Sequence, residues 1–567
     1  MTSARTSDLW WKNAVVYCLD VETFLDWGGD GRGDFAGLTE RVDYLAGIGV
    51  SCIWLMPFQP SPNRDDGYDI TDYYAVDSRL GSLGDFVTFV RTAKDRGLRV
   101  IVDLVVNHTS DKHPWFRASR ASRDNPYRDY YVWVDEPPPG AADAVVFPDA
   151  EDSVWARDDR TGQWYLHHFY SHQPDLNISN PAVRDEIAKI VGFWLELGVD
   201  GFRVDAVPFL IEQSPGAVSL DPHEVLRDLR AFVSRRRGDA MMLGEVNLPA
   251  RQLRHFFGDA DADELNMCFD FSLMQATYLS LARGDSRPIR RALERRPAVA
   301  EESQWAVFVR NHDELTLDQL SERERSEVFA AFGPDPDMQL FGRGLRRRLP
   351  PMLGGDQARI RLVYSLLFSL PGTPVLYYGE EIGMGENLGV PGRLSVRTPM
   401  QWTDEHNGGF SSARPSRLPR PVVEGPFGPL AVNVADQRRD PSSLLNWFER
   451  IIRRRRETPE IGWGAVTLLD TGGDHAVLAH RCDWEGSAVV AVHNLSAEAR
   501  HTRIDLGPTQ EGDRLVDLLT TDAPRAVPGP SGPLGGGQQS APALELKLEG
   551  YRFAWLRLQS AASRTAP

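Results

Sequence analysis

Residues 98–108, LRVIVDLVVNH, form an apolar run that ends in polar side chains. A run this rich in Val, Ile and Leu is typical of a parallel strand buried on both faces. Polar groups past the carboxyl ends of several buried parallel strands are the arrangement of the active site in a (β/α)8 barrel. Three more runs of this form follow, namely GVDGFRVDAV (198–207), MMLGEVN (241–247) and WAVFVRNHDE (305–314).

The segments around these runs alternate between strand and helix patterns. Apolar residues recur at a helical period over residues 38–48, and Pro181 suits the first turn of a helix over residues 181–197. This alternation favours a parallel α/β sheet. We therefore predict an α/β fold, a (β/α)8 TIM barrel. Its eight strands are predicted at residues 14–19, 51–56, 98–106, 201–204, 241–244, 267–271, 306–310 and 374–378.

A chain of 567 residues exceeds one ordinary core, so several domains are expected. We predict that residues 1–108 and 175–460 form the barrel, interrupted after its third strand by an irregular lobe, residues 109–174. A second long insertion, residues 315–355, is predicted to be a lid. Short alternating strands predict a C-terminal antiparallel β-sandwich over residues 461–560. Within it, residues 520–543 are rich in Pro and Gly and are predicted to be a surface loop, and the chain is expected to fray from about residue 560.

Composition narrows the class of protein. Acidic residues outnumber basic ones, 80 to 63, so nucleic acid is not an expected partner. No run of 18 apolar residues and no signal sequence is apparent, so we expect no membrane association and a cytoplasmic location. The four cysteines are too irregularly spaced for a disulfide framework or a zinc site. A homo-oligomer is left open.

Asp205 and Glu245 are the predicted catalytic pair. Retaining glycoside hydrolysis needs one carboxylate as nucleophile and one as acid and base. Asp205 lies two residues after Arg203, on the same face of a strand, so the guanidinium can hold it ionised. Apolar residues before Glu245 would raise its pKa toward that of a useful acid. Asp313 offers a third carboxylate, which could grip sugar hydroxyls. Any one of these acids alone would more often be an ordinary loop acid, but four strand-end clusters favour one site.

With these segments the chain resembles the α-amylase superfamily of retaining α-glucoside enzymes, glycoside hydrolase family 13. The resemblance implies that Asp205 is the nucleophile, Glu245 the acid/base and Asp313 the stabiliser of the transition state. It also implies that the chemistry needs no cofactor. The matching segments occur in the family's order, and they are DLVVNH (103–108), QPDLN (173–177), GFRVDAV (201–207), GEVN (244–247) and RNHDE (310–314).

The resemblance also implies a sugar subsite. DDGYD (65–69) is similar to the exo-acting branch, where Tyr68 would stack on the non-reducing glucose. Asp65 would pair with an arginine, which we expect to be Arg397 of VRTPMQW (396–402), and so close the end of the pocket. A closed pocket favours a small α-glucoside such as maltose or trehalose. The remaining residues implied to bind substrate are His108, Phe147, Gln173, Arg203, His312 and Glu314.

Within the superfamily, the trehalose synthase branch is the most similar, over about residues 9–410. Its marks include NHTSDKHPWF, FVRNHDELTL, FGPDPDMQL and RRRLPPML. The implied function is conversion of maltose to trehalose by intramolecular transglucosylation through a β-glucosyl-enzyme. The alternative is an α-glucosidase or transglucosylase that uses water or another acceptor. A non-catalytic sugar-binding protein is disfavoured, because all three carboxylates are present.

The sequence departs from this branch in several places. Asn247-Leu248-Pro249 replaces an Asn-Gln-Trp-Pro run, and Asp270 replaces a histidine. PGRLS (391–395) replaces an acidic Gly-Asp-Arg segment. The first strand carries Cys18, Asp20 and Glu22 in place of more usual residues. We expect these changes to lie where an acceptor sugar would bind, and to leave bond cleavage intact.

Two segments are candidates for a structural calcium ion. DWGGDGRGD (26–34) resembles a calcium loop, with Asp26, Asp30, Arg32 and Asp34 as the assigned residues. A simple Gly/Asp turn is an equal alternative, because Gly28 stands where related enzymes often have a side-chain ligand. The second candidate pairs Asn107 with Asp175, between the barrel and the lobe.

Overall fold

The structure is a computed structural model that describes residues 9–140, 145–148, 150–212, 221–258, 262–510, 512–527 and 543–559. Eight parallel strands close into a barrel, which confirms the predicted TIM-barrel fold. Each strand lies within or beside one of the predicted runs. The strands are β1 (Val16–Leu19), β2 (Cys52–Leu55), β3 (Arg99–Leu104), β7 (Gly201–Val204), β8 (Met241–Gly244), β9 (Met267–Phe269), β10 (Gln304–Phe308) and β14 (Thr373–Tyr377).

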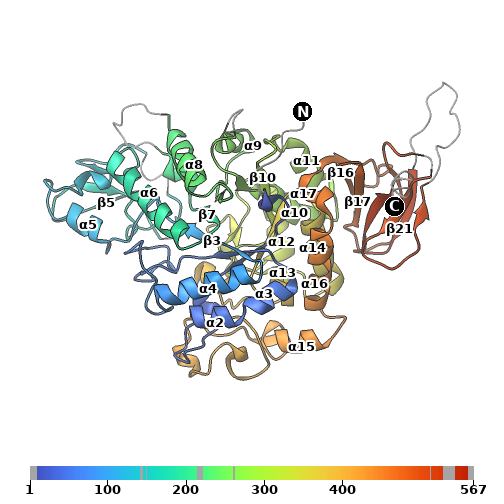
Figure 1. The fold of residues 1–567 in the computed structure, drawn as a ribbon, viewed down its shortest axis with the longest axis horizontal. Coiled ribbons are helices and arrows are strands. Elements are labelled where there is room, and N and C mark those ends of the chain that lie inside the picture. The colour runs from blue at the N-terminus through green and yellow to red at the C-terminus, as the bar shows by residue number, and fades with distance from the viewer. Residues whose placement is uncertain are drawn as a thin grey trace.

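The barrel strands are buried almost throughout, as their continuous apolar sequences require. Helices pack around them (Figure 1). These begin at residues suited to a helix start: Ser82 forms a capping box before α4 (Leu83–Asp95), and Asn180 with Pro181 begins α6 (Pro181–Glu196). The β3–β7 register pairs Asp103 with Arg203, so two polar side chains meet inside the barrel end.

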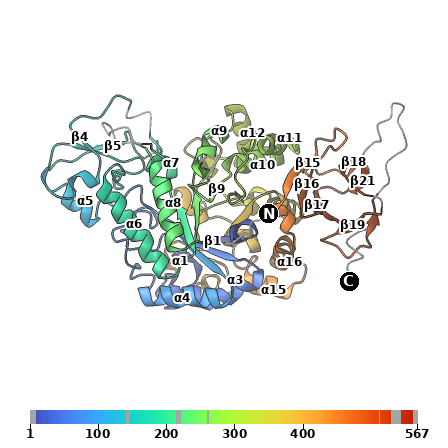
Figure 2. The ribbon, with the colours of Figure 1, turned by 45° about the horizontal axis from the view of Figure 1, so that its top comes forward.

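The lobe after β3 contains helix α5 (Pro114–Ser119) and a three-stranded antiparallel sheet. The strands are β4 (Trp133–Val134), β5 (Trp155–Arg157) and β6 (Trp164–Leu166). The ring of Phe116 stacks on Trp133 of β4 and packs edge-on against Tyr165 of β6. An isolated bridge between His108 and Asp175 ties the base of the lobe to the end of β3. The lobe projects to one side of the barrel in Figures 1 and 2.

The segment predicted to be a lid contains helix α12 (Glu322–Phe332), the short helix α13 (Leu349–Met352) and a small sheet. The sheet consists of β11 (Leu315–Thr316), β13 (Gly344–Leu345) and β12 (Gln339–Leu340). It touches the lobe, because the rings of Phe341 and Phe147 lie 5.1 Å apart and Arg343 donates a hydrogen bond of 2.8 Å to the Val146 carbonyl. Two insertions distant in sequence therefore meet above the barrel.

The C-terminal region is built from antiparallel sheets, as predicted, on the far side of the barrel from the lobe (Figure 2). A six-stranded sheet is formed by β15 (Ala465–Leu468), β16 (Val477–Trp484), β17 (Ser487–Asn494), β22 (Phe553–Gln559), β19 (Arg514–Asp517) and β20 (Arg525–Ala526). A two-stranded sheet, β18 (Arg500–Asp505) with β21 (Ala543–Leu548), shares a core with it. Most of the predicted loop at residues 520–543, and the end of the chain from residue 560, lie outside the described residues.

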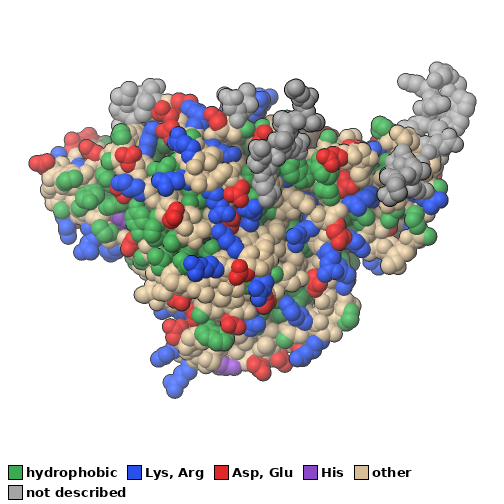
Figure 3. Space-filling view, in the orientation of Figure 1, with side chains coloured by type: hydrophobic (Ala, Val, Ile, Leu, Met, Phe, Trp, Pro, Cys, Tyr) green, Lys and Arg blue, Asp and Glu red, His purple; other side chains and the backbone are tan. Residues whose placement is uncertain are grey.

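Charges of both signs are interspersed over the face seen in Figure 3. None of the helices in the described part of the chain is long and apolar enough to cross a membrane. The four cysteines are buried and unpaired.

Candidate active site

A small pocket lies at the carboxyl end of the barrel strands, where the sequence predicts the chemistry. It brings together side chains from six separate segments and from the lobe. Six of its residues were predicted from sequence, whereas Phe169 and Arg393 were not. The lining residues are Asp65, Tyr68, His108, Phe169, Asp205, Glu245, Asp313 and Arg393.

Arg203 connects the predicted catalytic pair. Its side chain on β7 is 1% exposed and donates hydrogen bonds to Asp205 and, at 2.7 Å, to Asp103. The other guanidinium nitrogen lies 2.7 Å from a carboxylate oxygen of Glu245. The same Glu245 oxygen accepts a bond of 3.2 Å from the Ala206 amide, whose residue has a left-handed φ of 48°. Asp205 and Glu245 are therefore held by one guanidinium and face the same pocket.

The pKa values of these acids are raised. Burial raises the pKa of Asp205 to about 6, against the opposing charge of Arg203. Burial raises the pKa of Glu245 further, to about 7, with Arg203 opposing and the charges of Asp205 and Asp313 adding to the rise. Asp103, also buried, has a pKa of about 6. Near neutral pH this order favours an ionised Asp205 beside a protonated Glu245, which is the starting state for a nucleophile and an acid.

Asp313 lies in a different electrostatic setting. One of its oxygens accepts bonds of 2.8 Å from Arg393 and 2.9 Å from Arg397, and the other lies 3.1 Å from His312. Burial acts to raise the pKa of Asp313, but His312, Arg393 and Arg397 lower it well below its ordinary value. Asp313 is therefore a fixed negative charge in the pocket wall.

The arginine that pairs with Asp65 is Arg393, and the prediction of Arg397 is wrong. Arg393 lies 2.6 Å from Asp65, which also accepts a bond of 2.9 Å from Gln173. Arg397 binds the next residue, Asp66, at 2.8 Å. The reason is that Arg397 is fully buried behind Asp313, while Arg393 lies on the short helix η6 (Gly392–Val396) at the pocket edge. Asp65 does pair with an arginine, but that arginine comes from the segment PGRLS (391–395).

Tyr68 of the pocket wall stacks on His312, which lies behind it. Their rings are 5.6 Å apart and nearly parallel, and the tyrosine hydroxyl lies 2.7 Å from His312 Nε2. Burial lowers the pKa of His312 to about 4, so this imidazole is neutral. His108 donates from Nε2 to the Tyr68 carbonyl at 3.0 Å and so fixes the backbone that carries Tyr68. These contacts hold the tyrosine ring at the pocket wall.

The family model for the α-amylase catalytic domain matches residues 21–329 and 346–464. The chain belongs to the α-amylase family. It is therefore an enzyme that acts on α-glucosides, and the resemblance found in the sequence is confirmed.

Related proteins match over nearly the whole chain. The trehalose synthase of Pimelobacter sp. (strain R48) is 41% identical over 97% of this chain and 96% of that protein. The trehalose synthase/amylase TreS of Mycobacterium tuberculosis is 43% identical over 88% of this chain and 84% of that protein. Among solved structures, the trehalulose synthase MutB from Pseudomonas mesoacidophila MX-45 has a TM-score of 0.74 and 29% identity, covering 97% of this chain and 99% of that one.

Other predicted residues of this α-amylase family member lie behind the pocket lining. Gln173 supports Asp65, as described above. Phe147, from the lobe, lies under Arg393, whose guanidinium carbon is 5.2 Å from the ring centre. Glu314 is buried 3.8 Å from Arg343 of the lid segment. None of these three is a lining residue.

The structure does not bring the calcium-loop residues together around a common point. Asp26 accepts hydrogen bonds from the Gly29 and Gly31 amides, and Asp34 from the amides of Trp27, Gly28 and Gly37. Asp30 accepts from the amide of Arg32, whose side chain lies 3.3 Å from Glu22. These carboxylates hold their own turn, which is the alternative reading of the segment. The residues as placed do not fit a calcium ion.

The second candidate calcium site is occupied by protein donors. One oxygen of Asp175 accepts a bond of 3.3 Å from the Asn107 amide, and the other binds the imidazole of His168. His168 also lies 3.1 Å from Glu212. Burial acts to lower the pKa of His168, but Asp175 and Glu212 raise it to about 10. A charged imidazole thus supplies positive charge here, and the pair does not fit a calcium ion.

The departures from the trehalose synthase pattern mostly lie outside the lining of this pocket. Asp270 pairs with Arg296 at 2.6 Å and caps the next helix. Asp20 pairs with Arg420 at 3.1 Å, and Cys18 is buried in β1. Of the changed segments, residues 391–395 alone supply a lining residue, Arg393.

Proposed function

We propose that this enzyme interconverts maltose and trehalose. The observation that carries the proposal is the pair of carboxylates, Asp205 and Glu245, held by Arg203 in a small pocket of the α-amylase family barrel. Trehalose synthases are similar to this chain over almost its full length, which supports an isomerase over an enzyme of long polysaccharides. The cavity's closed end, formed by Asp65 and Arg393, favours a short substrate.

The proposed reaction begins at the glucose unit in the pocket. Asp205 attacks the anomeric carbon while Glu245 gives its proton to the glycosidic oxygen. The bond from the anomeric carbon to the glycosidic oxygen breaks, and a β-glucosyl ester of Asp205 forms. Glu245 is then ionised and accepts the proton of the anomeric hydroxyl of the released glucose. That oxygen attacks the anomeric carbon of the glucosyl ester, the bond from this carbon to Asp205 breaks, and an α,α-linked disaccharide results. Two inversions give net retention.

The second group of charges is proposed to bind rather than to transfer protons. Asp65 and Asp313 accept hydrogen bonds from glucose hydroxyls, and Tyr68 offers an aromatic face to the sugar ring. The bonds to Asp313 can strengthen as the ring flattens toward an oxocarbenium-like transition state.

An isomerase must keep the released glucose and exclude water while the glucosyl-enzyme exists. The lid segment and the lobe meet at Phe341 and Phe147, and Phe147 packs under Arg393 of the pocket. This contact supports a role for both insertions in closing the pocket.

The test is an incubation of the purified protein with maltose, followed by quantification of trehalose and free glucose. We expect trehalose to exceed glucose, and maltose to appear when trehalose is the starting sugar. The Asp205→Asn protein is the matched control and should form neither product. Glucose without trehalose would instead establish an α-glucosidase, and transfer to an added acceptor a transglucosylase.

A further inference from the structure

A second cavity, of about 320 Å³, lies outside the barrel beside the loop that carries Glu245. Its walls come from α9 (Ala250–Leu253), α10 (Phe271–Arg283), α11 (Arg287–Arg295) and the start of the lid segment. The volume is that of a small-molecule site. Two of the sequence departures, at Pro249 and Asp270, border this cavity and not the catalytic pocket.

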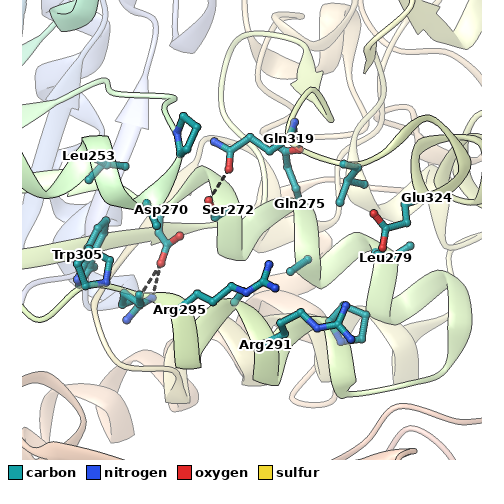
Figure 4. Close-up of a pocket in the computed structure, with 18 residues that line it drawn as sticks. Leu253, Asp270, Ser272, Gln275, Leu279, Arg291, Arg295, Trp305, Gln319 and Glu324 are labelled. Atoms are coloured by element: carbon teal, nitrogen blue, oxygen red, sulfur yellow. Dashed lines mark hydrogen bonds and ion pairs between the residues drawn. The ribbon is translucent and has the colours of Figure 1, made fainter.

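One wall of the cavity is cationic. Arg291 and Arg295 are one helical turn apart on α11, on the same side of the cavity (Figure 4). Within the part of the chain that the structure describes, neither forms an ion pair or hydrogen bond. The two carboxylates of the cavity are already engaged: Asp270 by Arg296 at 2.6 Å, and Glu324 by the cap of its own helix, 3.8 Å from Arg283. Two guanidinium groups are thus left to bind an anion.

The opposite wall offers acceptors. The side-chain amide of Gln319 donates hydrogen bonds to Oδ1 of Asn247, at 2.6 Å, and to the Leu248 carbonyl, at 3.4 Å. Ser272 donates its hydroxyl to Gln319 at 2.5 Å, so the oxygens of both side chains keep lone pairs but no donors (Figure 4). Such a wall suits a ligand with hydroxyl donors, and Leu253, Leu279 and Trp305 add apolar surface. A phosphate group on one side and sugar hydroxyls on the other match the two walls.

We propose that this cavity, the α11 pocket, binds a phosphorylated monosaccharide, with Arg291 and Arg295 holding the phosphate. The occupant would lie against Gln319, whose amide binds Asn247, two residues beyond Glu245. An occupant of the α11 pocket that moves Gln319 also moves Asn247 in the loop after Glu245, because a hydrogen bond joins the two side chains. Binding in the α11 pocket therefore changes the turnover rate.

Isothermal titration with glucose 6-phosphate tests the site, with inorganic phosphate and glucose as separate probes. We expect saturable binding of glucose 6-phosphate, weaker binding of inorganic phosphate, and a loss of affinity of about tenfold or more in the double variant Arg291→Ala/Arg295→Ala. The control Arg91→Ala/Arg235→Ala removes two exposed arginines on α4 and α8 (Glu224–Arg236) and should bind like the wild type. Both variants should keep the melting temperature, since these side chains are exposed.

Three results would overturn the site: no saturation at about 10 mM glucose 6-phosphate, equal binding by the Arg291/Arg295 variant, or binding of glucose as tight as that of its phosphate. The link to catalysis is measured separately, as turnover of maltose against glucose 6-phosphate concentration. It predicts a change of about twofold or more that follows the binding curve and is absent from the double variant. A flat response with confirmed binding would refute the link. The titration needs no turnover, so its outcome is independent of the proposed function.

Discussion

The two sides of the catalytic pocket hold similar numbers of acids but different numbers of arginines. On one side, Arg203 alone contacts Asp103, Asp205 and Glu245. On the other side, three arginines contact Asp65, Asp66 and Asp313, and they are Arg393, Arg397 and Arg420. Arg420 also pairs with a further buried acid, Asp20. Both groups are buried, so the balance of charge decides the protonation of each acid.

The pKa values of Asp205, Glu245, Asp66 and Asp313 follow this balance, whereas burial raises the pKa of Asp20 to about 7 despite its contact with Arg420. One cation cannot offset the burial of three acids, so the pKa values beside Arg203 are raised to about 6 and about 7. On the other side, burial acts to raise the pKa of Asp66, but Arg420 and Arg397 lower it below its ordinary value. The nucleophile Asp205 and the acid/base Glu245 thus share one arginine, while Asp66 and Asp313 each contact two. The contrast predicts which substitutions change chemistry and which change binding.

The largest effect is expected for Asp205→Asn, which keeps the side chain's size but removes the nucleophile. Turnover of maltose should fall by about 10⁴-fold or more. The melting temperature and circular dichroism spectrum serve as the control, because a misfolded protein would also be inactive. A well-folded Asp205→Asn enzyme with near wild-type turnover would contradict the assignment.

Arg203→Lys comes next, since a lysine cannot bridge three carboxylates. We expect kcat to fall by about 10²- to 10³-fold. Arg203 lowers the pKa values of both Asp205 and Glu245. Weakening its contacts should therefore move both limbs of the pH–rate profile to higher pH. An unchanged profile would show that the single guanidinium does not set these pKa values.

On the other side of the pocket, Asp65→Asn should raise KM by about 10- to 100-fold with a smaller change in kcat, because one charge-assisted hydrogen bond to substrate is weakened. Asp65 is not among the largest causes of the pKa shifts of Asp205 and Glu245. The rising and falling limbs of the pH–rate profile of Asp65→Asn should therefore lie at the same pH as in the wild type. Steady-state kinetics across pH provides the measurement. A shift in the pH at which kcat/KM of Asp65→Asn rises or falls would contradict the separation of the two groups of acids.

The pH dependence of the wild type gives the smallest effect. Asp205 must be ionised, so kcat/KM should rise as pH increases through about 6. Glu245 must be protonated, so kcat/KM should fall as pH increases through about 7, by about tenfold per unit beyond it. A plateau extending well above pH 8 would contradict the raised pKa of Glu245.

Much of this architecture is encoded locally. Continuous apolar runs such as residues 98–108 mark buried parallel strands, and parallel strand ends meet, so Asp205 and Glu245 could be predicted to share a site. The ion pairs of Arg393 and Arg420 could not be predicted, because Arg393 lies on a short 3-10 helix and Arg420 in an irregular loop, and the positions of both depend on tertiary packing rather than on a periodic pattern. The same limit explains the mistaken partner of Asp65 and the location of Asp270.

The most direct test of the central claim is to trap the covalent intermediate. Incubating the enzyme with a fluorinated glucosyl fluoride, which slows release of the glucosyl group, followed by peptide mass spectrometry, should locate one glucosyl unit on Asp205. The account predicts this adduct in the wild type and its absence from Asp205→Asn. A glucosyl unit on any other residue, or turnover by Asp205→Asn without an adduct, would contradict it.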